Sequence, residues 1–293
     1  MLSPPVLSCH PPAKLNLGLH VLRRRADGYH DIETVLLPIG WRDTLTAEHA
    51  DGGTVVLTCS EPALPTDGRS LVVRAAHALQ AWAAEHAFDP WTLGACLHLT
   101  KAIPFGAGLG GGSSDAAHAL RLLNTLWDLG ATTVDLHPIA AKLGADVPVF
   151  LYDAPMHATG TGTTLAPLTD DAGAPCAFPF PLVVVMPDAE IGTAHAYSLV
   201  TPNDVSRPDL AGIVRSNDLV QWRQRLTNDF EAPVLAQSPA IASAKQALLN
   251  AGAGYAAMTG SGAAVVGVFE GAARSAADVL RAAGTRVWCA VAP

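Results

Sequence analysis

Hydrophobic and polar residues alternate along residues 13–22 with the two-residue period of a β-strand. One face of this strand is apolar, and the other carries Lys14, Asn16, Gly18 and His20. The same pattern predicts strands over residues 31–39 and 94–103, and a two-stranded hairpin within 44–59 around Asp51-Gly52-Gly53. Apolar residues at helical spacing predict helices over residues 71–86, 116–126 and 137–143.

The second half of the chain mixes helices and strands. Residues 182–186 form a short apolar run closed by Pro187, which is typical of a buried strand. Strands are also predicted over residues 286–291 and on either side of the turn Thr259-Gly260-Ser261-Gly262. Helices are predicted over residues 193–200, 241–251 and 275–283, with another beginning at Asn228-Asp229-Phe230-Glu231. Because strands and helices do not alternate strictly, the sequence predicts an α+β fold.

The stretch from Pro104 to Ala117 is rich in glycine and lies between a predicted strand and a predicted helix. Glycine has no Cβ to hold a ligand away from the backbone. The bare N–H groups of a helix start attract anions, and Ser113, Ser114 and Asp115 are suitable N-caps. The pattern therefore predicts a phosphate-binding loop, to which we assign Pro104, Gly106, Ala107, Gly108, Leu109, Gly110, Gly111, Gly112, Ser113 and Ser114.

Three other interpretations of this stretch fit less well. Gly106, Gly108 and Gly111 satisfy the G-x-G-x-x-G fingerprint of a dehydrogenase, but the acidic residues about 20 positions later lie in no convincing strand. A P-loop needs a lysine after its last glycine, whereas Gly112 leads to Ser113. A flexible Gly/Ser linker lacks an apolar helix directly behind it.

Composition limits the class of protein. The 293-residue chain is 49% hydrophobic and 15% charged, which predicts a well-buried globule of one large or two ordinary domains. The net charge of −8 argues against nucleic acid or an anionic membrane as the main partner. The five cysteines form no C-x-x-C pair, which favours a reducing cytoplasm over a disulfide framework or zinc site. We see neither a membrane-spanning apolar run nor a signal-peptide pattern.

Lys14 and Asp146 are candidates for catalysis, each with a structural alternative. Lys14 is one of four lysines in the chain and lies on an otherwise apolar strand. It either supplies the ammonium that the glycine loop lacks or protects an exposed strand edge from pairing with another chain, as an edge-strand gatekeeper. Asp146 precedes Pro148, which fits the first turn of a helix, so Asp146 is either a helix cap or a catalytic carboxylate.

Tyr29 and His30 follow the turn Ala26-Asp27-Gly28 at the start of a predicted strand. They fit either stacking on a flat ligand or ordinary cross-strand packing. We interpret the neighbouring Arg23-Arg24-Arg25 as a solvated hairpin end rather than an anion-binding patch.

Motifs along nearly the whole chain resemble those of the GHMP small-molecule kinases. The loop over residues 106–116 and the turn Met258-Thr259-Gly260-Ser261-Gly262 are similar to those of the whole superfamily. Asp27-Gly28-Tyr29-His30 and Gly144-Ala145-Asp146-Val147-Pro148 are more particular to a branch that phosphorylates a cytidine diphosphate alcohol. The resemblance extends to Pro12-Ala13-Lys14-Leu15-Asn16-Leu17 and Asn228-Asp229-Phe230-Glu231.

The resemblance implies a two-domain α+β GHMP kinase fold with its active site in the cleft between the domains. Residues 1–155 would form the ATP-binding domain and residues 156–293 the substrate-side domain. The implied activity is transfer of a phosphoryl group from ATP to the C2 hydroxyl of the methylerythritol moiety, a step of non-mevalonate isoprenoid synthesis. The partner is then a small molecule, and the sequence leaves open whether the protein is a monomer or a homodimer.

The resemblance also assigns roles to single residues. Asp146 would be the catalytic base and Lys14 its charged partner. Tyr29 and Tyr197 would stack on the cytosine, and the other substrate contacts would come from His30, Asn16 and Gly260. Mg²⁺ would enter with ATP rather than occupy a metal site of its own, with an oxygen ligand from Ser113, Ser114 or Asp115.

Two alternatives to this function stay open besides a dehydrogenase. One is another kinase of the same superfamily, which cytidine nucleotides would not inhibit. The other is a nucleotide sensor that kept the glycine loop and lost the chemistry, although the presence of both Lys14 and Asp146 argues against it.

Overall fold

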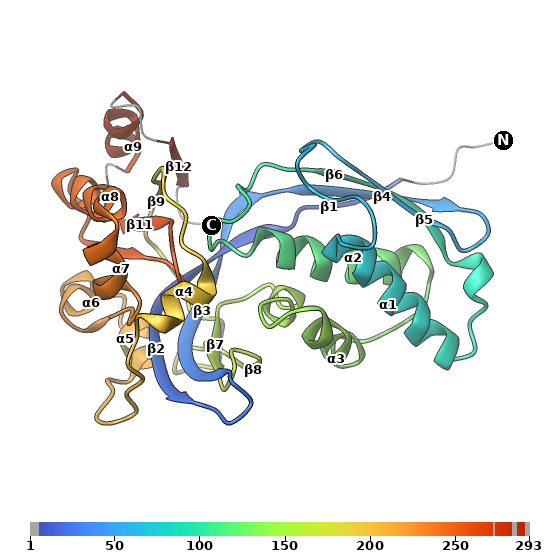
Figure 1. Cartoon of the computed structure of the whole chain (residues 1–293), viewed down its shortest axis with the longest axis horizontal. Helices are drawn as coiled ribbons and strands as arrows, with labels where there is room; N and C mark the ends of the chain where they lie inside the picture. Colours follow the sequence, from blue (N-terminus) through green and yellow to red (C-terminus); the bar gives the residue numbers. More distant parts are fainter. Residues whose placement is uncertain (1–5, 272, 283–285, 291–293) are drawn as a thin grey trace. The chain divides into compact units, whose positions relative to one another are not determined.

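The computed structural model describes residues 6–271, 273–282 and 286–290, and they form two compact units (Figure 1). The first unit contains the chain up to Ala13 together with Trp41–Pro104 and Gly110–Asp153. The second contains Lys14–Gly40, Phe105–Leu109 and the chain from Ala154 onward. The chain therefore passes between the units more than once, and the glycine loop contributes residues to both. The predicted division of function at residue 155 stays a prediction.

The first unit contains a four-stranded sheet in the order β1-β4-β6-β5. The strands are β1 (Leu7–Cys9), β4 (Thr44–Ala50), β5 (Val55–Cys59) and β6 (Gly94–Thr100). Strand β6 lies between β4 and β5, antiparallel to β4 and parallel to β5, so the predicted hairpin within residues 44–59 is wrong. The long-range pairing prevails because β6 buries Ala95, Leu97 and Leu99. At its start, a Cβ on Gly94 would lie 2.1 Å from the carbonyl oxygen of Ala50.

Helices α1 (Leu71–Glu85) and α2 (Gly111–Leu126) pack together beside this sheet (Figure 1). Helix α3 (Thr133–Leu143) and the 3₁₀ turns η1 (Pro90–Thr92) and η2 (Pro148–Leu151) complete the unit. The predicted N-caps of α2 are wrong, because the cap is Gly110, in the left-handed region at φ 72° and without a side-chain cap hydrogen bond. Asp146 is not a cap either, since Val147 is the residue that precedes η2.

The second unit contains two four-stranded sheets, ordered β2-β3-β7-β8 and β10-β11-β9-β12. The first consists of β2 (Pro12–Arg24), β3 (His30–Arg42), β7 (Met156–Thr159) and β8 (Thr164–Pro167). The second consists of β9 (Leu182–Met186), β10 (Tyr255–Met258), β11 (Val265–Val268) and β12 (Arg286–Ala290). Strands β2, β3, β9, β10, β11 and β12 confirm the predicted positions, and β2 is buried on both faces as far as Val21.

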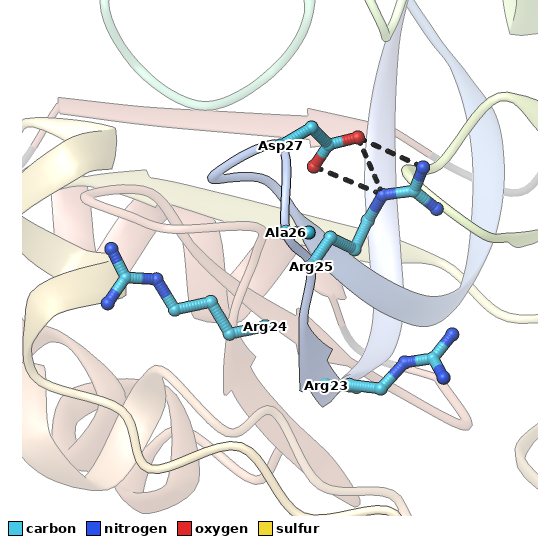
Figure 2. A pocket seen from close by; sticks show the side chains of 5 residues that line it. All are labelled: Arg23, Arg24, Arg25, Ala26 and Asp27. Atoms are coloured by element: carbon cyan, nitrogen blue, oxygen red, sulfur yellow. Dashed lines mark hydrogen bonds and ion pairs between the residues drawn. The ribbon is translucent and has the colours of Figure 1, made fainter.

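The connection between β2 and β3 is an exposed turn rich in arginine (Figure 2). The Arg25 Nε donates to Asp27 at 3.0 Å, and the Arg23 Nε donates to Asp31 at 2.9 Å. Arg24 points away from the Arg25–Asp27 pair in Figure 2. The arginine run is therefore an exposed hairpin end, as predicted, while its not being an anion-binding patch stays a prediction.

The described part of the second unit also contains six helices, α4 (Thr193–Ser198), α5 (Leu210–Arg215), α6 (Leu219–Arg225), α7 (Glu231–Gln237), α8 (Pro239–Asn250) and α9 (Ala273–Ala282). Helices α6, α8 and α9 pack against the sheet that contains β9 and β11, while α5 contacts α6 and α7 contacts α8. The sequence prediction missed α5 and α6. The predicted ends of the last helix and last strand, Ala283 and Val291, lie outside the described residues. No helix in the described ranges has the length and apolar character needed to cross a membrane.

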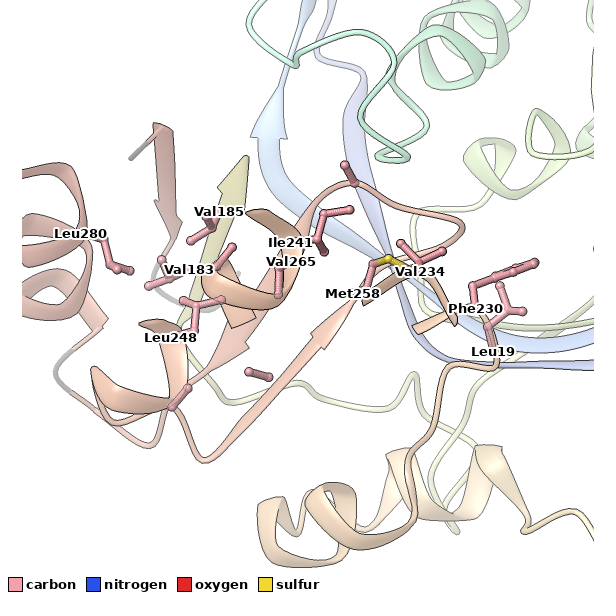
Figure 3. Packing of buried hydrophobic residues seen from close by; sticks show 14 of the residues in the cluster. Leu19, Val183, Val185, Phe230, Val234, Ile241, Leu248, Met258, Val265 and Leu280 are labelled. Carbon is pink, nitrogen blue, oxygen red and sulfur yellow. The ribbon is translucent and has the colours of Figure 1, made fainter. Parts of the chain in front are cut away.

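A hydrophobic cluster forms the core between these helices and strands (Figure 3). Val183, Val185 and Val265 from the sheet pack with Ile241 and Leu248 from α8. The same cluster contains Met258 and Ala263, the residues that flank the turn over 259–262. Because each large aliphatic side chain contributes about 1.5–3 kcal/mol when fully buried, this core fixes both ends of the second glycine turn.

Candidate active site

The first part of the glycine loop, residues 105–109, packs against the second glycine turn. Gly106 and Gly108 have φ angles of +73° and +75°, a region that L side chains rarely adopt. A Cβ on Gly108 would lie only 2.6 Å from the carbonyl oxygen of Gly262. The backbone N–H of Lys14 donates to the carbonyl of Leu109 at 2.9 Å, which ties the loop to β2.

The second glycine turn also approaches Lys14 and Asn16. The backbone N–H of Asn16 donates to Thr259 Oγ1 at 2.7 Å. A Cβ on Gly260 would lie 3.1 Å from Asn16 Oδ1 and 3.7 Å from Lys14 Nζ. The structure therefore brings together four of the predicted site residues, Lys14, Asn16, Gly108 and Gly260.

Lys14 is buried, with an exposed fraction of 4%, and its ammonium donates to Asn16 Oδ1 at 2.7 Å. The Asn16 amide donates in turn to Thr34 Oγ1 at 3.1 Å, and Thr34 donates to the carbonyl of Gly18 at 2.6 Å. An edge-strand gatekeeper is exposed to solvent, so that alternative for Lys14 is wrong. A buried ammonium held by an oriented amide is suited to stabilising negative charge.

Helix α2, which follows the glycine loop, is anchored by buried charges. Lys101 forms ion pairs with both Asp43 and Asp115, and Asp43 also accepts hydrogen bonds from the N–H groups of Ala102 and Ile103. Burial raises the pKa of the Asp115 carboxyl to about 7, an effect that the Lys101 ammonium opposes and the Asp43 carboxylate reinforces. These contacts fix the end of β6 relative to the first turn of α2.

Asp146 is an exposed residue of the first unit, between α3 and η2. Lys14 belongs to the second unit, so the predicted pairing of the two side chains stays a prediction. Asp146 does not cap η2, so the interpretation of this residue as a helix cap is wrong.

The aromatic residues predicted to bind cytosine differ in their surroundings. The His30 and Tyr197 rings stack, with centroids 4.7 Å apart and planes at 21°. Phe230 meets Tyr197 edge-on at 4.8 Å, which supports the ring from another direction. Tyr29 is 67% exposed, so its ring is available to a ligand.

The chain was compared with families of known proteins. A model of the GHMP kinases N terminal domain matches residues 70–154, and one of the GHMP kinases C terminal domain matches residues 210–286. The chain belongs to the GHMP kinase family. The glycine loop lies within the first match, so it is part of a kinase domain and not a linker or a dehydrogenase fingerprint.

Individual relatives of this GHMP kinase match over nearly the full length. A protein of Salinibacter ruber named 4-diphosphocytidyl-2-C-methyl-D-erythritol kinase is 52% identical, over 96% of this chain and 97% of the relative. A crystal structure of 4-(cytidine 5'-diphospho)-2C-methyl-D-erythritol kinase has a TM-score of 0.76 at 36% identity, and the match covers 97% of this chain and 98% of that chain. The structure of a homoserine kinase from Cytophaga hutchinsonii has a TM-score of 0.72 at 18% identity, and the match covers 98% of this chain and 94% of that chain. At this identity the likeness shows that the fold is shared and no more.

Three polar residues near the predicted site were not among its predicted members. Thr259 and Thr34 hold Asn16, and Asn228 donates to the carbonyl oxygens of Met258 and Gly260 at 2.9 and 2.8 Å. Asn228 and Thr259 lie within motifs that carried the family resemblance, so the sequence did mark their positions. Thr34 lies in an ordinary strand pattern, and nothing local distinguishes it.

Proposed function

We propose that the protein transfers the γ-phosphoryl group of ATP to the C2 hydroxyl of 4-diphosphocytidyl-2-C-methyl-D-erythritol, giving the 2-phosphate and ADP. The observation that carries this assignment is the 52% identity over nearly the whole chain with a relative that has this name. The protein would act on a small molecule in the cytoplasm, on the pathway to isoprenoid precursors that does not use mevalonate.

The glycine loop is the proposed site for the phosphates of ATP. Gly106 and Gly112 have no neighbour within 3.5 Å of an added Cβ, so a ligand can approach their backbone. The N–H groups at the start of α2 supply donors and the positive end of the helix dipole. In the proposed division, residues 1–155 hold ATP and residues 156–293 contribute to the acceptor site.

Ser113 is the residue at the loop that best fits Mg²⁺ brought in by ATP. Mg²⁺ usually keeps several of its waters, so its protein ligand needs access to solvent. Ser114 and Asp115 are almost fully buried, and Asp115 is already paired with Lys101, whereas Ser113 is partly exposed. Mg²⁺ when bound neutralises charge on the phosphates.

Asp146 is the proposed base that accepts the proton of the C2 hydroxyl. Proton abstraction by a positioned carboxylate contributes about 10²–10⁴ in rate. The buried Lys14 ammonium, oriented by Asn16, would stabilise the negative charge that develops on the attacking oxygen.

Cytosine recognition is proposed for Tyr29, His30 and Tyr197. Stacking on an aromatic ring is worth about 1–3 kcal/mol per base and does not distinguish bases. We therefore assign the selection of cytosine to hydrogen bonds from His30, whose ring is held by its stacking on Tyr197.

The assignment is tested by measuring ADP release with the purified protein and identifying the product by mass spectrometry. We expect turnover with the cytidine diphosphate alcohol and none with homoserine or mevalonate; the reverse preference would reject the substrate. Asp146→Asn should lower kcat by about 10² or more and leave ATP binding intact. Asp153→Asn is the matched control, because Asp153 is an exposed carboxylate of the same unit that pairs with Arg121. If Asp146→Asn keeps most of the rate, Asp146 is not the base.

A further inference from the structure

A cavity of about 580 Å³ lies in the second unit, among residues of α6, α7, α8 and β10. Its charged lining consists of Arg207, Arg223, Lys245, Asp229 and Glu231. No residue to which we assigned a role in phosphoryl transfer or cytosine binding lines this cavity. The volume is in the range of about 300–1,000 Å³ that is typical of small-molecule sites.

Both carboxylates of the cavity are already committed to partners within the protein. Asp229 accepts two hydrogen bonds from Arg207 Nη2, at 2.6 and 2.7 Å, and one from the N–H of Val21 at 2.8 Å. Glu231 pairs with Lys245 and accepts a hydrogen bond from the N–H of Met258 at 2.6 Å. With three cationic side chains against two carboxylates, the lining has one positive charge in excess.

The arginines retain donors that no protein acceptor uses well. Arg223 is exposed, and the one hydrogen bond that the structure gives it runs to the carbonyl of Ala253 at 3.4 Å, the long limit for such a bond. The Nε of Arg207 is buried and has no hydrogen-bond partner among the described residues. Buried donors are almost always paired in folded proteins, so the Arg207 Nε calls for an acceptor from outside the chain, either a water or a ligand.

We propose that this cavity binds a small organic phosphate, with Arg223 as its principal anchor. Arginine presents a planar fork of donors that matches the oxygens of a phosphate. Leu226, Tyr255 and Ala256 line the same cavity and offer an apolar surface to the organic part of the ligand. The site is distinct from the glycine loop, where we place the phosphates of ATP.

The cavity is connected to the second glycine turn by hydrogen bonds. Asn228 lines the cavity and donates to the carbonyl oxygens of Met258 and Gly260. Glu231, on the same side, holds the N–H of Met258. An occupant therefore lies against the residues that position Gly260 beside Lys14 and Asn16.

The test is calorimetric titration of the full chain with inorganic pyrophosphate, after the glycine loop has been saturated with ADP. We expect binding with a Kd on the order of 1 mM or tighter. Arg223→Gln should weaken this binding at least about tenfold, equivalent to about 1.4 kcal/mol. Arg225→Gln is the matched control, because Arg225 is exposed on the same helix and does not line the cavity.

Arg223→Gln should also leave kcat and KM of the kinase reaction unchanged when pyrophosphate is absent, which shows that the variant is folded. Three results would overturn the proposal. They are the absence of pyrophosphate binding in the presence of ADP, an equal Kd for Arg223→Gln and the unaltered chain, and a loss of basal activity in Arg223→Gln. The last result would place Arg223 in the active site instead.

Discussion

Replacing Gly108 by Ala tests the contact between the two glycine turns, and Gly106→Ala is its matched control. Both glycines belong to the loop segment 105–109 and have nearly equal φ angles, +75° and +73°. Nothing lies within 4 Å of a Cβ added at Gly106, whereas one added at Gly108 would lie 2.6 Å from the carbonyl oxygen of Gly262. The two substitutions therefore share the backbone strain and differ in the steric clash.

The structure allows the two costs to be separated. An alanine in the left-handed region costs about 1–2 kcal/mol, and this applies to both variants. A carbon and a carbonyl oxygen approach to about 3.3 Å, so Gly108→Ala must move the two turns apart by roughly 0.7 Å. Overpacking of this kind adds about 1–3 kcal/mol. We expect Gly106→Ala to lose about 1–2 kcal/mol and Gly108→Ala about 2–5 kcal/mol.

Thermal unfolding measures the difference, because 1 kcal/mol shifts the Tm of a protein of this size by about 2–4 °C. Gly108→Ala should also raise the KM of the acceptor, since the displaced turn carries Gly260 next to Asn16. Equal Tm values and equal acceptor KM values for the two variants would refute the idea that these turns pack directly on each other.

Three further predictions concern charge and recognition. A hydrogen bond with His157 and the proximity of His20, 3.5 Å away, lower the pKa of Glu33 to about 2, below its usual 4.5, so its stabilisation is complete above about pH 5 and is lost as the pH falls toward 2. Glu33→Gln should therefore cost about 1–3 kcal/mol at pH 7 in urea unfolding, and the difference from the unaltered chain should shrink below pH 5; a difference independent of pH would contradict this. Lys101→Met leaves two buried carboxylates without their cation and should cost about 3–5 kcal/mol in the same assay, so a loss below 1 kcal/mol would show that the cluster is not buried in solution. Tyr29→Ala removes an exposed ring and should change stability by less than about 0.5 kcal/mol, while it raises the KM of the cytidine alcohol at least about tenfold and leaves that of ATP nearly unchanged. The opposite pattern of KM changes would remove Tyr29 from the acceptor site.

Local pattern was sufficient for most of the elements. The five-residue apolar run 182–186 is strand β9, and the apolar stripe from Leu71 is helix α1. Helices α5 and α6 were missed although Asp209 and Asp218 cap them, because each helix is too short to show a clear apolar period. Neither aspartate is followed by a long amphipathic run.

Non-local contacts account for the errors. The two strands within residues 44–59 were predicted correctly, but their partner β6 begins more than 30 residues later, and turn residues alone could not reveal it. Similarly, alternation along β2 placed Lys14 and Asn16 on one face and could not show that this face is also buried. Thr259, which is 243 residues from Asn16, is one of the groups that cover it.

A glycine in this loop can be required by the protein's own structure or by a bound ligand, and the two cases differ from one position to the next. A Cβ at Gly108 would lie 2.6 Å from the backbone carbonyl oxygen of Gly262, so packing within the protein is enough to require glycine there, whereas one at Gly111 would make a tight contact of 3.1 Å with the Ile103 side chain. A Cβ at Gly106 would have no neighbour within 4 Å, but its φ of +73° already favours glycine, and one at Gly112 would meet Leu71 Cδ1 at 3.9 Å, an ordinary contact. The sequence pattern treats all four alike because both requirements select the same residue. Of these four, Gly112 is the position where neither a clash nor the backbone conformation requires glycine, and there the proposed ATP site rests on the loop itself.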